Sequence, residues 1–338
     1  MSEEPDEYRR LALSWNAAAA DYAAVFDSLE AALLPVAPDL MIVPQVLGPA
    51  IDLAWERALP LIIHAAHLPA AAPRRSALRP LRGAIAGYVA QLRARRRLEV
   101  ARRARTRYPS TAELFRRSTV VATTHPSIEA DPRVPPNFHL VGPVIPEPLS
   151  PISRETEEWL LRQAPAGIVL AAFGTLVRLS ERQVSALAEG LADCGVGVLW
   201  AVPERHHDRV RRHSASFRAE AFVPQAAILA LAAVRAFVTH AGANSALEAM
   251  RFGRPMLALP FMYDQHHYAR RAADLSVGLV LDPHTLTSAG VRAAIQRLLH
   301  ERRFAEAAGR LATELQRAPG VTGAAGVVEA TLAGLRAR

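Results

Sequence analysis

The chain has 338 residues, of which 51% are hydrophobic and 21% charged, and its formal net charge is +8. This length exceeds what one hydrophobic core usually organises, so two domains are expected. No apolar run reaches the roughly 20 residues that a membrane-spanning helix needs, and the acidic start MSEEPDEYRR is unlike a secretory signal. These features predict a globular protein of the cytoplasm.

All 40 basic residues are arginine, which suggests the codon bias of a GC-rich genome and makes the positive charge weak evidence about partners. The densest run, residues 93–107, lacks interleaved aromatic residues that stack on bases, so no nucleic-acid partner is expected. We interpret this run as a solvated helix face, with peripheral contact to an anionic membrane as the alternative. The single cysteine, Cys194, excludes an intrachain disulfide and is expected to be a small core or surface residue.

The first half of the chain shows the alternation of a parallel α/β fold. Apolar residues three or four positions apart predict an amphipathic helix that ends at Pro35. Short apolar runs, typical of buried strands, then alternate with helical segments. The predicted elements are the helix with Tyr22, Phe26, Leu29 and Leu33, strands over 38–43, 59–65 and 118–125, and a helix over 49–58.

Proline is concentrated over residues 132–151, where it removes backbone donors and stiffens the chain. We interpret this segment as a linker between an N-terminal domain, 1–131, and a C-terminal domain, 152–318, which a final helix over 319–338 follows. The second domain has continuous apolar runs, which predict a doubly wound sheet covered on both faces. Its strands are predicted over 167–173, 195–202, 219–223, 235–240, 255–260 and 277–282.

Polar residues gather where these strands should end. The strand over 235–240 ends at His240, Gly242 allows close approach of a ligand, and Asn244 and Ser245 open a helix whose free amides suit a phosphate. Ser245 and Glu248 also fit an S-x-x-E capping box, which would give them a purely structural role. Spacing alone does not decide between the two interpretations.

Neighbouring segments favour a nucleotide-sugar site. Phe222 can cover a base, Glu248 can accept hydrogen bonds from ribose hydroxyls, and Asp264 with Gln265 can hold sugar hydroxyls. Buried carboxylates need donors, and the vicinal hydroxyls of a sugar supply them in pairs.

From Phe222 to Gln265 the sequence gives FVPQ, THAGANSALE and DQ, which resembles the signature box of the family 1 UDP-glycosyltransferases. AAFGTL is similar to the first loop of that family's donor domain, and PSIEADPRVPPNFHLVGPV to the approach to its interdomain linker. The resemblance implies an α/β fold of the GT-B type, with two Rossmann-like doubly wound domains.

The resemblance also implies roles for individual residues. Phe222 would border the uracil with Gln225 beside the nucleoside, and Glu248 would bind the ribose. Asp264 and Gln265 would contact the sugar. The diphosphate would be bound by His240, Gly242, Asn244 and Ser245, with Gly174 and Thr175 on the opposite loop. Phe222, Ala243 and Tyr268 depart from the commonest pattern, and the last two leave sugar and base preference open.

Members of this family normally begin with a strand and a glycine-histidine loop whose histidine is the general base. This chain begins too late to contain that loop, so the N-terminal domain is expected to be incomplete. An aspartate that orients the base usually follows the strand that 38–43 resembles, where this chain has Pro44 and Gln45. The catalytic residues are therefore unknown, with His64 and His67 as weak candidates for a substitute base.

The other histidines give weaker evidence of a functional role. His206 and His207 are interpreted as a solvated helix start, and His266 and His267 as the edge of the sugar pocket. Neither pair has Cys or Glu at ligand spacing, so no metal site is expected. No cofactor is expected besides a UDP-sugar as co-substrate.

The leading hypothesis is an inverting glycosyltransferase that transfers a hexose from a UDP-sugar to a hydroxyl of a small lipophilic acceptor, a natural product or lipid. The alternative is a non-catalytic nucleotide-sugar-binding or partner protein derived from that family, since the resemblance implies that both residues of the base dyad are missing. A sheet without its first strands would expose apolar edges, so a protein partner that covers them is expected unless the chain is part of a longer product. The acceptor, the sugar and the oligomeric state stay open.

Overall fold

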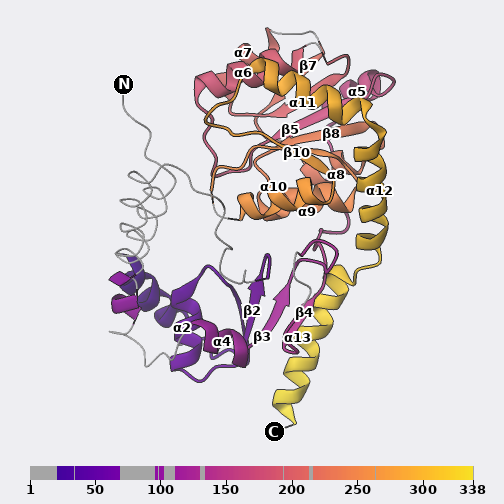
Figure 1. Ribbon diagram of the computed structural model, residues 1–338. Coiled ribbons are helices and arrows are strands. Elements are labelled where there is room, and N and C mark those ends of the chain that lie inside the picture. The colour runs from indigo at the N-terminus through magenta and orange to yellow at the C-terminus, as the bar shows by residue number, and fades with distance from the viewer. Residues whose placement is uncertain are drawn as a thin grey trace, which may run out of the picture. The chain divides into compact units, whose positions relative to one another are not determined.

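A computed structural model describes residues 21–33, 35–68, 96–97, 99–102, 111–129, 134–192, 194–212, 216–262 and 264–337 (Figure 1). The chain divides into two compact units. The first comprises the described residues of Met1–Thr123, Arg133–Leu140 and Thr322–Arg338, and the second those of Thr124–Pro132 and Val141–Val321.

The first unit contains a four-stranded parallel sheet in which the strands follow their chain order. Each strand reaches the next through a helical crossover or a longer segment, as parallel pairing requires. Residues 21–33 are helical, in agreement with the predicted amphipathic helix. The elements are β1 (Met41–Pro44), α2 (Gly48–Glu56), β2 (Leu61–Ala65), α4 (Thr111–Arg117), β3 (Thr119–Ala122) and β4 (Phe138–Leu140).

A buried charge ties the helices of the first unit together. Asp52 on α2 is fully buried. Its carboxylate accepts a 2.5 Å hydrogen bond from the hydroxyl of Tyr22 and two 2.7 Å bonds from Nε and Nη2 of Arg102. Burial and the Asp52 carboxylate raise the pKa of Tyr22, so the phenol stays a donor. A buried ion is tolerated when its lone pairs are satisfied in this way.

The second unit contains a six-stranded, fully parallel sheet with the order β10-β9-β8-β5-β6-β7. Figure 1 shows α6, α7 and α11 on one face of this sheet and α8, α9 and α10 on the other. Its strands are β5 (Ile168–Ala172), β6 (Gly197–Ala201), β7 (Phe217–Glu220), β8 (Val234–Thr239), β9 (Met256–Ala258) and β10 (Gly278–Val280).

Helices enclose the strands of the second unit, and all five residues of β5 are buried. Ser153 caps α5 by accepting a 3.3 Å bond from the Thr156 amide, and Thr287 caps α11 by accepting from Gly290. None of the residues of α13 is buried. The helical elements of the second unit are α5 (Arg154–Gln163), α6 (Glu181–Ala192), η1 (Glu204–His206), α7 (His207–Arg211), α8 (Gln225–Ala230), α9 (Ala243–Arg251), α10 (Gln265–Asp274), α11 (Ser288–His300) and α12 (Arg302–Gln316). Helix α13 (Gly320–Arg336) follows them, and from Thr322 on it belongs to the first unit.

Two predicted segments differ in the structure. The proline-rich segment over 132–151 contains β4, which pairs in parallel with β3, because the stretch Phe138–Leu140 has no proline and keeps its backbone donors. The strand predicted over 219–223 begins and ends earlier, at Phe217 and Glu220. Its partner β6 ends at Ala201, so residues beyond Glu220 have no strand to pair with. Phe222 therefore lies in a loop.

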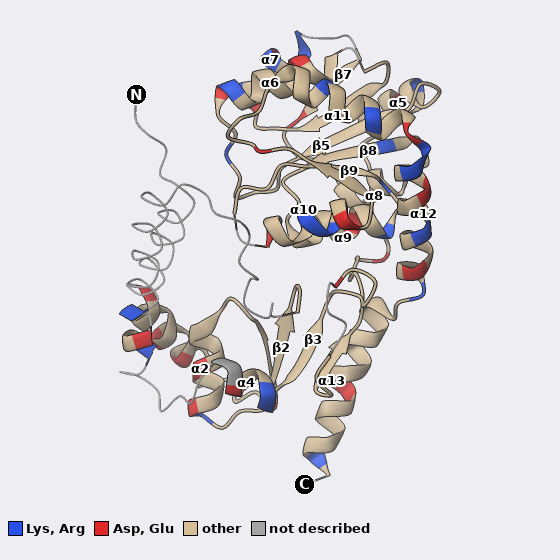
Figure 2. Ribbon diagram, viewed as in Figure 1, with Lys and Arg blue, Asp and Glu red and all other residues tan. Residues whose placement is uncertain are grey.

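Figure 2 marks residues of both charge signs along α12. The helix is amphipathic, since its charged residues are mostly exposed while Phe304, Leu311 and Leu315 are buried. Most of the arginine run over 93–107 lies outside the described residues, so membrane contact through it stays a prediction. Within the part of the chain that the structure describes, no helix has the length and apolar character needed to cross a membrane.

Candidate functional site

The residues predicted to bind a ligand lie at the carboxyl edge of the second sheet. From β5 the chain builds the sheet in one direction through β6 and β7, and then in the other through β8, β9 and β10. The order reverses between β5 and β8, which are hydrogen-bonded neighbours. Ligands of open α/β sheets bind at such a reversal. The loop after β5 contains Gly174, and the loop after β8 contains His240.

His240 lies between two glycines. A Cβ atom built on Gly174 would be 2.9 Å from Cε1 of His240, and one built on Gly242 would be 2.5 Å from its Nε2. Both distances are too short for a side chain, so only glycine leaves room for the imidazole. Gly174 also has a φ of +65°, which favours glycine. Burial lowers the pKa of His240, while nearby Asp264 opposes this shift, so the ring is neutral at pH 7.

The start of α9 differs from the predicted capping box. The helix begins at Ala243, its N-cap is Gly242, and no side chain of the N-cap residue bonds to it. Ser245 therefore lies inside the first turn and is not the cap, so the capping-box interpretation is wrong. The cap comes from Asp264, whose Oδ2 accepts a 2.7 Å hydrogen bond from the Ala243 amide. Because Asp264 is 21 residues away, only the folded loop after β9 brings it there.

Gln225, Ser245 and Glu248 form a second cluster beside the same helix. The side-chain amide of Gln225, at the start of α8, donates to Ser245 Oγ at 3.2 Å and to Glu248 Oε2 at 2.6 Å. Burial raises the pKa of Glu248, and the bond from Gln225 opposes that shift. The cluster gives a partly buried carboxylate of fixed orientation, which suits a ligand that offers hydroxyl donors.

Gln265 has a defined role in the loop before α10. Its Oε1 accepts hydrogen bonds from the amides of Phe261 and Met262, at 2.8 and 3.0 Å. The side chain is buried, so it shapes the loop that positions Asp264. The sequence predicted sugar contacts for Asp264 and Gln265. It did not predict that Asp264 accepts from the Ala243 amide, or that Gln265 accepts from the amides of Phe261 and Met262.

Four of the predicted residues, Gly174, Thr175, Phe222 and Asn244, are exposed on loops or at a helix start. Phe222 is 81% exposed in the loop between β7 and α8, where it presents an aromatic face to solvent. Thr175 and Asn244 are also exposed. The carbonyl of Thr175 accepts a 2.9 Å bond from Arg178, which closes the turn after Gly174.

The two candidates for a substitute base lie in the first unit, at the carboxyl end of β2. His64 is the last but one residue of that strand, and its Nε2 is 3.4 Å from Oγ1 of Thr123. Burial lowers the pKa of His64. Nδ1 of His67 lies 2.8 Å from the carbonyl oxygen of Leu68, so a proton on Nδ1 would leave Nε2 as an acceptor. Gln45 follows β1 and donates its backbone amide to the His64 carbonyl at 2.8 Å.

The remaining histidines differ from expectation in one case. His206 is buried, so the prediction of a solvated residue is wrong for it. Its ring turns inward because η1 places it against the core that contains Val210. His267 lies 3.7 Å from the buried carboxylate of Glu129. Among the described residues, no group of three or more His, Cys, Asp or Glu side chains is arranged to hold a metal ion.

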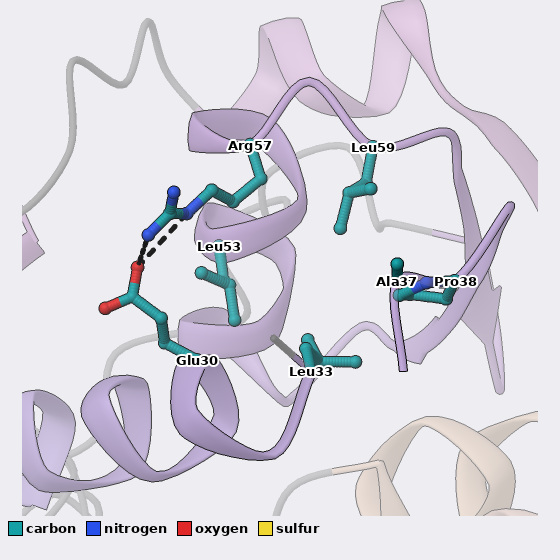
Figure 3. A pocket seen from close by; sticks show the side chains of 7 residues that line it. All are labelled: Glu30, Leu33, Ala37, Pro38, Leu53, Arg57 and Leu59. Atoms are coloured by element: carbon teal, nitrogen blue, oxygen red, sulfur yellow. Dashed lines mark hydrogen bonds and ion pairs between the residues drawn. The ribbon is translucent and has the colours of Figure 1, made fainter. Parts of the chain in front are cut away.

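The first unit also has a pocket of about 180 Å³, shown in Figure 3. Leu33, Leu53 and Leu59 supply apolar lining, and an ion pair between Glu30 and Arg57 lies at one side. These residues precede β1 and β2 or belong to helices, so the pocket is near the amino ends of the strands. None of the predicted site residues lines it.

A family model described as "UDP-glucoronosyl and UDP-glucosyl transferase" matches residues 107–319. Among curated proteins, UDP-glucuronosyltransferase 3A2 of Mus musculus is 28% identical over 175 residues, which are 51% of this chain and 34% of that protein. UDP-glucuronosyltransferase 2A1 of Rattus norvegicus is 30% identical over 177 residues, which are 52% of this chain and 33% of that protein. The chain therefore matches about a third of the length of these relatives.

Solved structures resemble almost the whole chain. The calicheamicin glycosyltransferase CalG4 superimposes with a TM-score of 0.72 and 21% identity, covering 99% of this chain and 85% of that one. An anthocyanidin 3-O-glucosyltransferase in complex with UDP gives a TM-score of 0.71 and 20% identity, covering 94% and 80%. These likenesses, with two parallel sheets flanked by helices, confirm the predicted GT-B fold.

Proposed function

Because this chain belongs to the UDP-glucoronosyl and UDP-glucosyl transferase family, we propose that its second unit binds a UDP-sugar and that the protein transfers the hexose to a hydroxyl of a small lipophilic acceptor. The transfer proceeds with inversion at the anomeric carbon. The observation that carries this proposal is the position of His240, held between Gly174 and Gly242 at the start of α9.

Each part of the donor has a matching feature in the second unit. The diphosphate lies against the first turn of α9, where Asn244 and Ser245 are, because a helix N-terminus offers free amides and a partial positive charge. The ribose hydroxyls donate to Glu248, which Gln225 orients. The uracil stacks on exposed Phe222. The sugar lies near Asp264 and Gln265, with Gly174 and Thr175 on the opposite loop.

The same groups assist departure of UDP. Negative charge grows on the diphosphate as the glycosidic bond breaks, and groups already in place stabilise that charge without reorganising. The neutral imidazole of His240 can donate a hydrogen bond from Nε2 to a phosphate oxygen. The helix start and the Ser245 hydroxyl add further donors. Acceleration comes from this difference in charge between ground state and transition state.

The acceptor hydroxyl needs a base, and the first unit offers His67 and His64. Of the two, His67 fits better, because its Nδ1 lies 2.8 Å from the Leu68 carbonyl oxygen, which favours the tautomer that carries its proton on Nδ1. Near His64, the described neighbour is the Thr123 hydroxyl, and a hydroxyl stabilises an imidazolium less well than a carboxylate does. A positioned base contributes roughly 10²- to 10⁴-fold in rate.

Isothermal titration calorimetry with UDP tests the donor site. We expect His240→Ala and Glu248→Ala each to weaken UDP binding by about 10- to 100-fold, the value of one hydrogen bond to a charged group. His300→Ala and Glu306→Ala, at exposed positions on α11 and α12, are the matched controls and should bind like the parent. Binding of UDP no tighter than that of AMP would contradict the proposal.

Transfer is tested separately, with radiolabelled UDP-glucose, UDP-glucuronic acid and UDP-N-acetylglucosamine against phenols, sterols and macrolides. Product above the rate without protein supports catalysis, and its loss in His67→Ala with UDP affinity unchanged would assign the base. The configuration of the product at the anomeric carbon, read by NMR, tests inversion.

A second function is favoured by Pro44 and Gln45, which follow β1 where the family has the aspartate that orients the base. Neither a proline nor a neutral amide supplies the negative charge with which an aspartate stabilises an imidazolium. If UDP binds and no donor gives product, the protein is a nucleotide-sugar-binding member of the family without transfer activity. The UDP titration and the transfer assay together therefore separate this function from catalysis.

A further inference from the structure

A small cavity of about 40 Å³ lies in the second unit, where β5 and β6 end. Phe173, Val177 and Val202 supply apolar walls, and Trp200 closes one side. The two aromatic side chains pack against each other, since the ring centroids of Trp200 and Phe173 are 6.4 Å apart. The volume is enough for one small ion or a few water molecules.

Two residues that line this cavity each have a buried polar atom without a hydrogen-bond partner among the described residues. Trp200 is 0% exposed and its Nε1 has none, and His206 is 6% exposed and its Nε2 has none. Burying a polar group without a partner costs about 1 to 3 kcal/mol. An indole N–H can only donate, so whatever satisfies Trp200 must accept a hydrogen bond.

The cavity has a positive lining. Arg178 and Arg205 belong to it, and no Asp or Glu is among the described residues that line it. Arg178 donates to the Thr175 carbonyl at 2.9 Å, which ties the cavity to the loop after β5. A ligand here meets donors and positive charge together with apolar contact, and a weakly hydrated anion fits that combination.

We propose that this cavity is a binding site for a small inorganic anion of halide or nitrate size, held by the indole N–H of Trp200 and by Nε2–H of His206. Arg178 and Arg205 supply the opposite charge. Gly174, which belongs to the proposed donor site, also lines this cavity, so the two sites adjoin at the loop after β5.

The electrostatics of His206 support this assignment. Burial lowers its pKa, and Arg205, Arg209 and His207 add to that shift, while Glu181 on α6 opposes it. The surroundings of the ring are thus mainly positive. A bound anion raises the pKa of His206 toward its ordinary value.

The test uses the indole N–H resonances of the full chain, which has four tryptophans. The Trp200 resonance is assigned by elimination with Trp→Phe variants at the other three positions. Sodium bromide is titrated against sodium gluconate at constant ionic strength, because gluconate is too large for the cavity. We expect a saturable shift of the Trp200 resonance alone with bromide and no shift with gluconate.

An arginine variant and a competition with UDP show whether bromide binds in this cavity and whether the cavity is part of the donor site. Arg205→Gln should weaken bromide binding by about two- to fivefold, as expected for an exposed charge, while Arg302→Gln on α12 should not. Saturating UDP should leave the bromide midpoint within twofold. A shift that does not saturate, or that gluconate reproduces, would leave the cavity to water and overturn the proposal. Displacement of bromide by UDP would make the cavity part of the donor site and also overturn it, without affecting the proposed transfer.

Discussion

The two units use buried polar residues differently. In the first unit, Asp52 accepts three hydrogen bonds from Tyr22 and Arg102, so other side chains of the protein compensate its charge. In the second, Gln225 orients Glu248, and Asn244 and Phe222 face solvent at the same sheet edge. A closed cluster serves stability, whereas a set of oriented groups that still faces solvent serves binding.

Opening the closed cluster tests the first half of this comparison. Asp52→Ala leaves the guanidinium of Arg102 buried without its carboxylate, which we expect to cost about 3 to 5 kcal/mol. Urea unfolding followed by circular dichroism measures this loss. Glu30→Gln, which breaks the exposed pair with Arg57, is the control and should cost about 0 to 1 kcal/mol.

UDP titration at low urea completes that experiment. The affinity of Asp52→Ala for UDP should equal that of the parent, since the donor site lies in the other unit. Equal stability losses in Asp52→Ala and Glu30→Gln would contradict the distinction between closed and exposed charges.

A methyl group added beside His240 tests the second half of this comparison, the role of the second unit in binding. Gly242 has an extended backbone with a φ of −61°, which alanine also adopts, so Gly242→Ala adds no backbone strain. The added Cβ would displace the imidazole. We expect UDP binding to weaken by about 10- to 100-fold, as for loss of one hydrogen bond to a charged group. The control is Gly309→Ala, where a Cβ meets nothing within 4 Å.

A double variant shows whether Gly242→Ala weakens UDP binding by displacing the His240 imidazole. In His240→Ala the clash is gone, so adding Gly242→Ala should weaken UDP binding no further, which is a non-additive cycle. Additive losses would mean that Gly242 acts through another contact.

Acid should distinguish the units by their histidines. Burial lowers the pKa of His240, His206 and His125 in the second unit and of His64 in the first. Below about pH 6.5 the unfolded chain binds more protons than the folded one, so stability falls as the pH falls toward the folded pKa.

Each such histidine contributes at most about 1.4 kcal/mol per pH unit. Urea unfolding at pH 7.5, 6.5 and 5.5 should therefore show the larger loss in the second unit. His240→Gln should reduce the slope of stability against pH, whereas His300→Gln, at an exposed position, should not. An unchanged slope in His240→Gln would contradict the assignment of a buried neutral ring.

The smallest effect concerns the cap of α9. Asp264→Asn keeps an acceptor for the Ala243 amide and removes a negative charge beside the proposed diphosphate site. UDP should bind about two- to fivefold more tightly, which corresponds to a charge near a helix end. The control is Asp282→Asn, since Asp282 also accepts from a backbone amide, that of His284, in a loop after β10. Weaker binding of UDP by Asp264→Asn would contradict the repulsion.

Several features of the site could be predicted from local sequence. His240 follows an apolar run, and Gly242 follows it at a spacing that suits a strand, a turn and a helix. The contact between Gly174 and His240 could not, because these residues lie in the loops after β5 and β8, two strands that pair only in the folded sheet.

The errors have a common physical cause. Phe217–Glu220 forms β7 instead of the more apolar run after it, because pairing with β6 decides where a strand ends. His206 is buried although its neighbours are polar, because η1 turns that one residue inward. Ser245 is not a cap, because Asp264 supplies that bond from another loop.

By itself the sequence determined the order of strands and helices, the α/β class and the residue types gathered at the strand ends, because hydrophobic periodicity and turn residues act over a few positions. The tertiary structure alone decided which of these residues touch. Glu248 meets Gln225 across 23 positions, and Asp264 meets the Ala243 amide across 21. Such contacts depend on how parallel strands align their carboxyl ends, which no local pattern encodes.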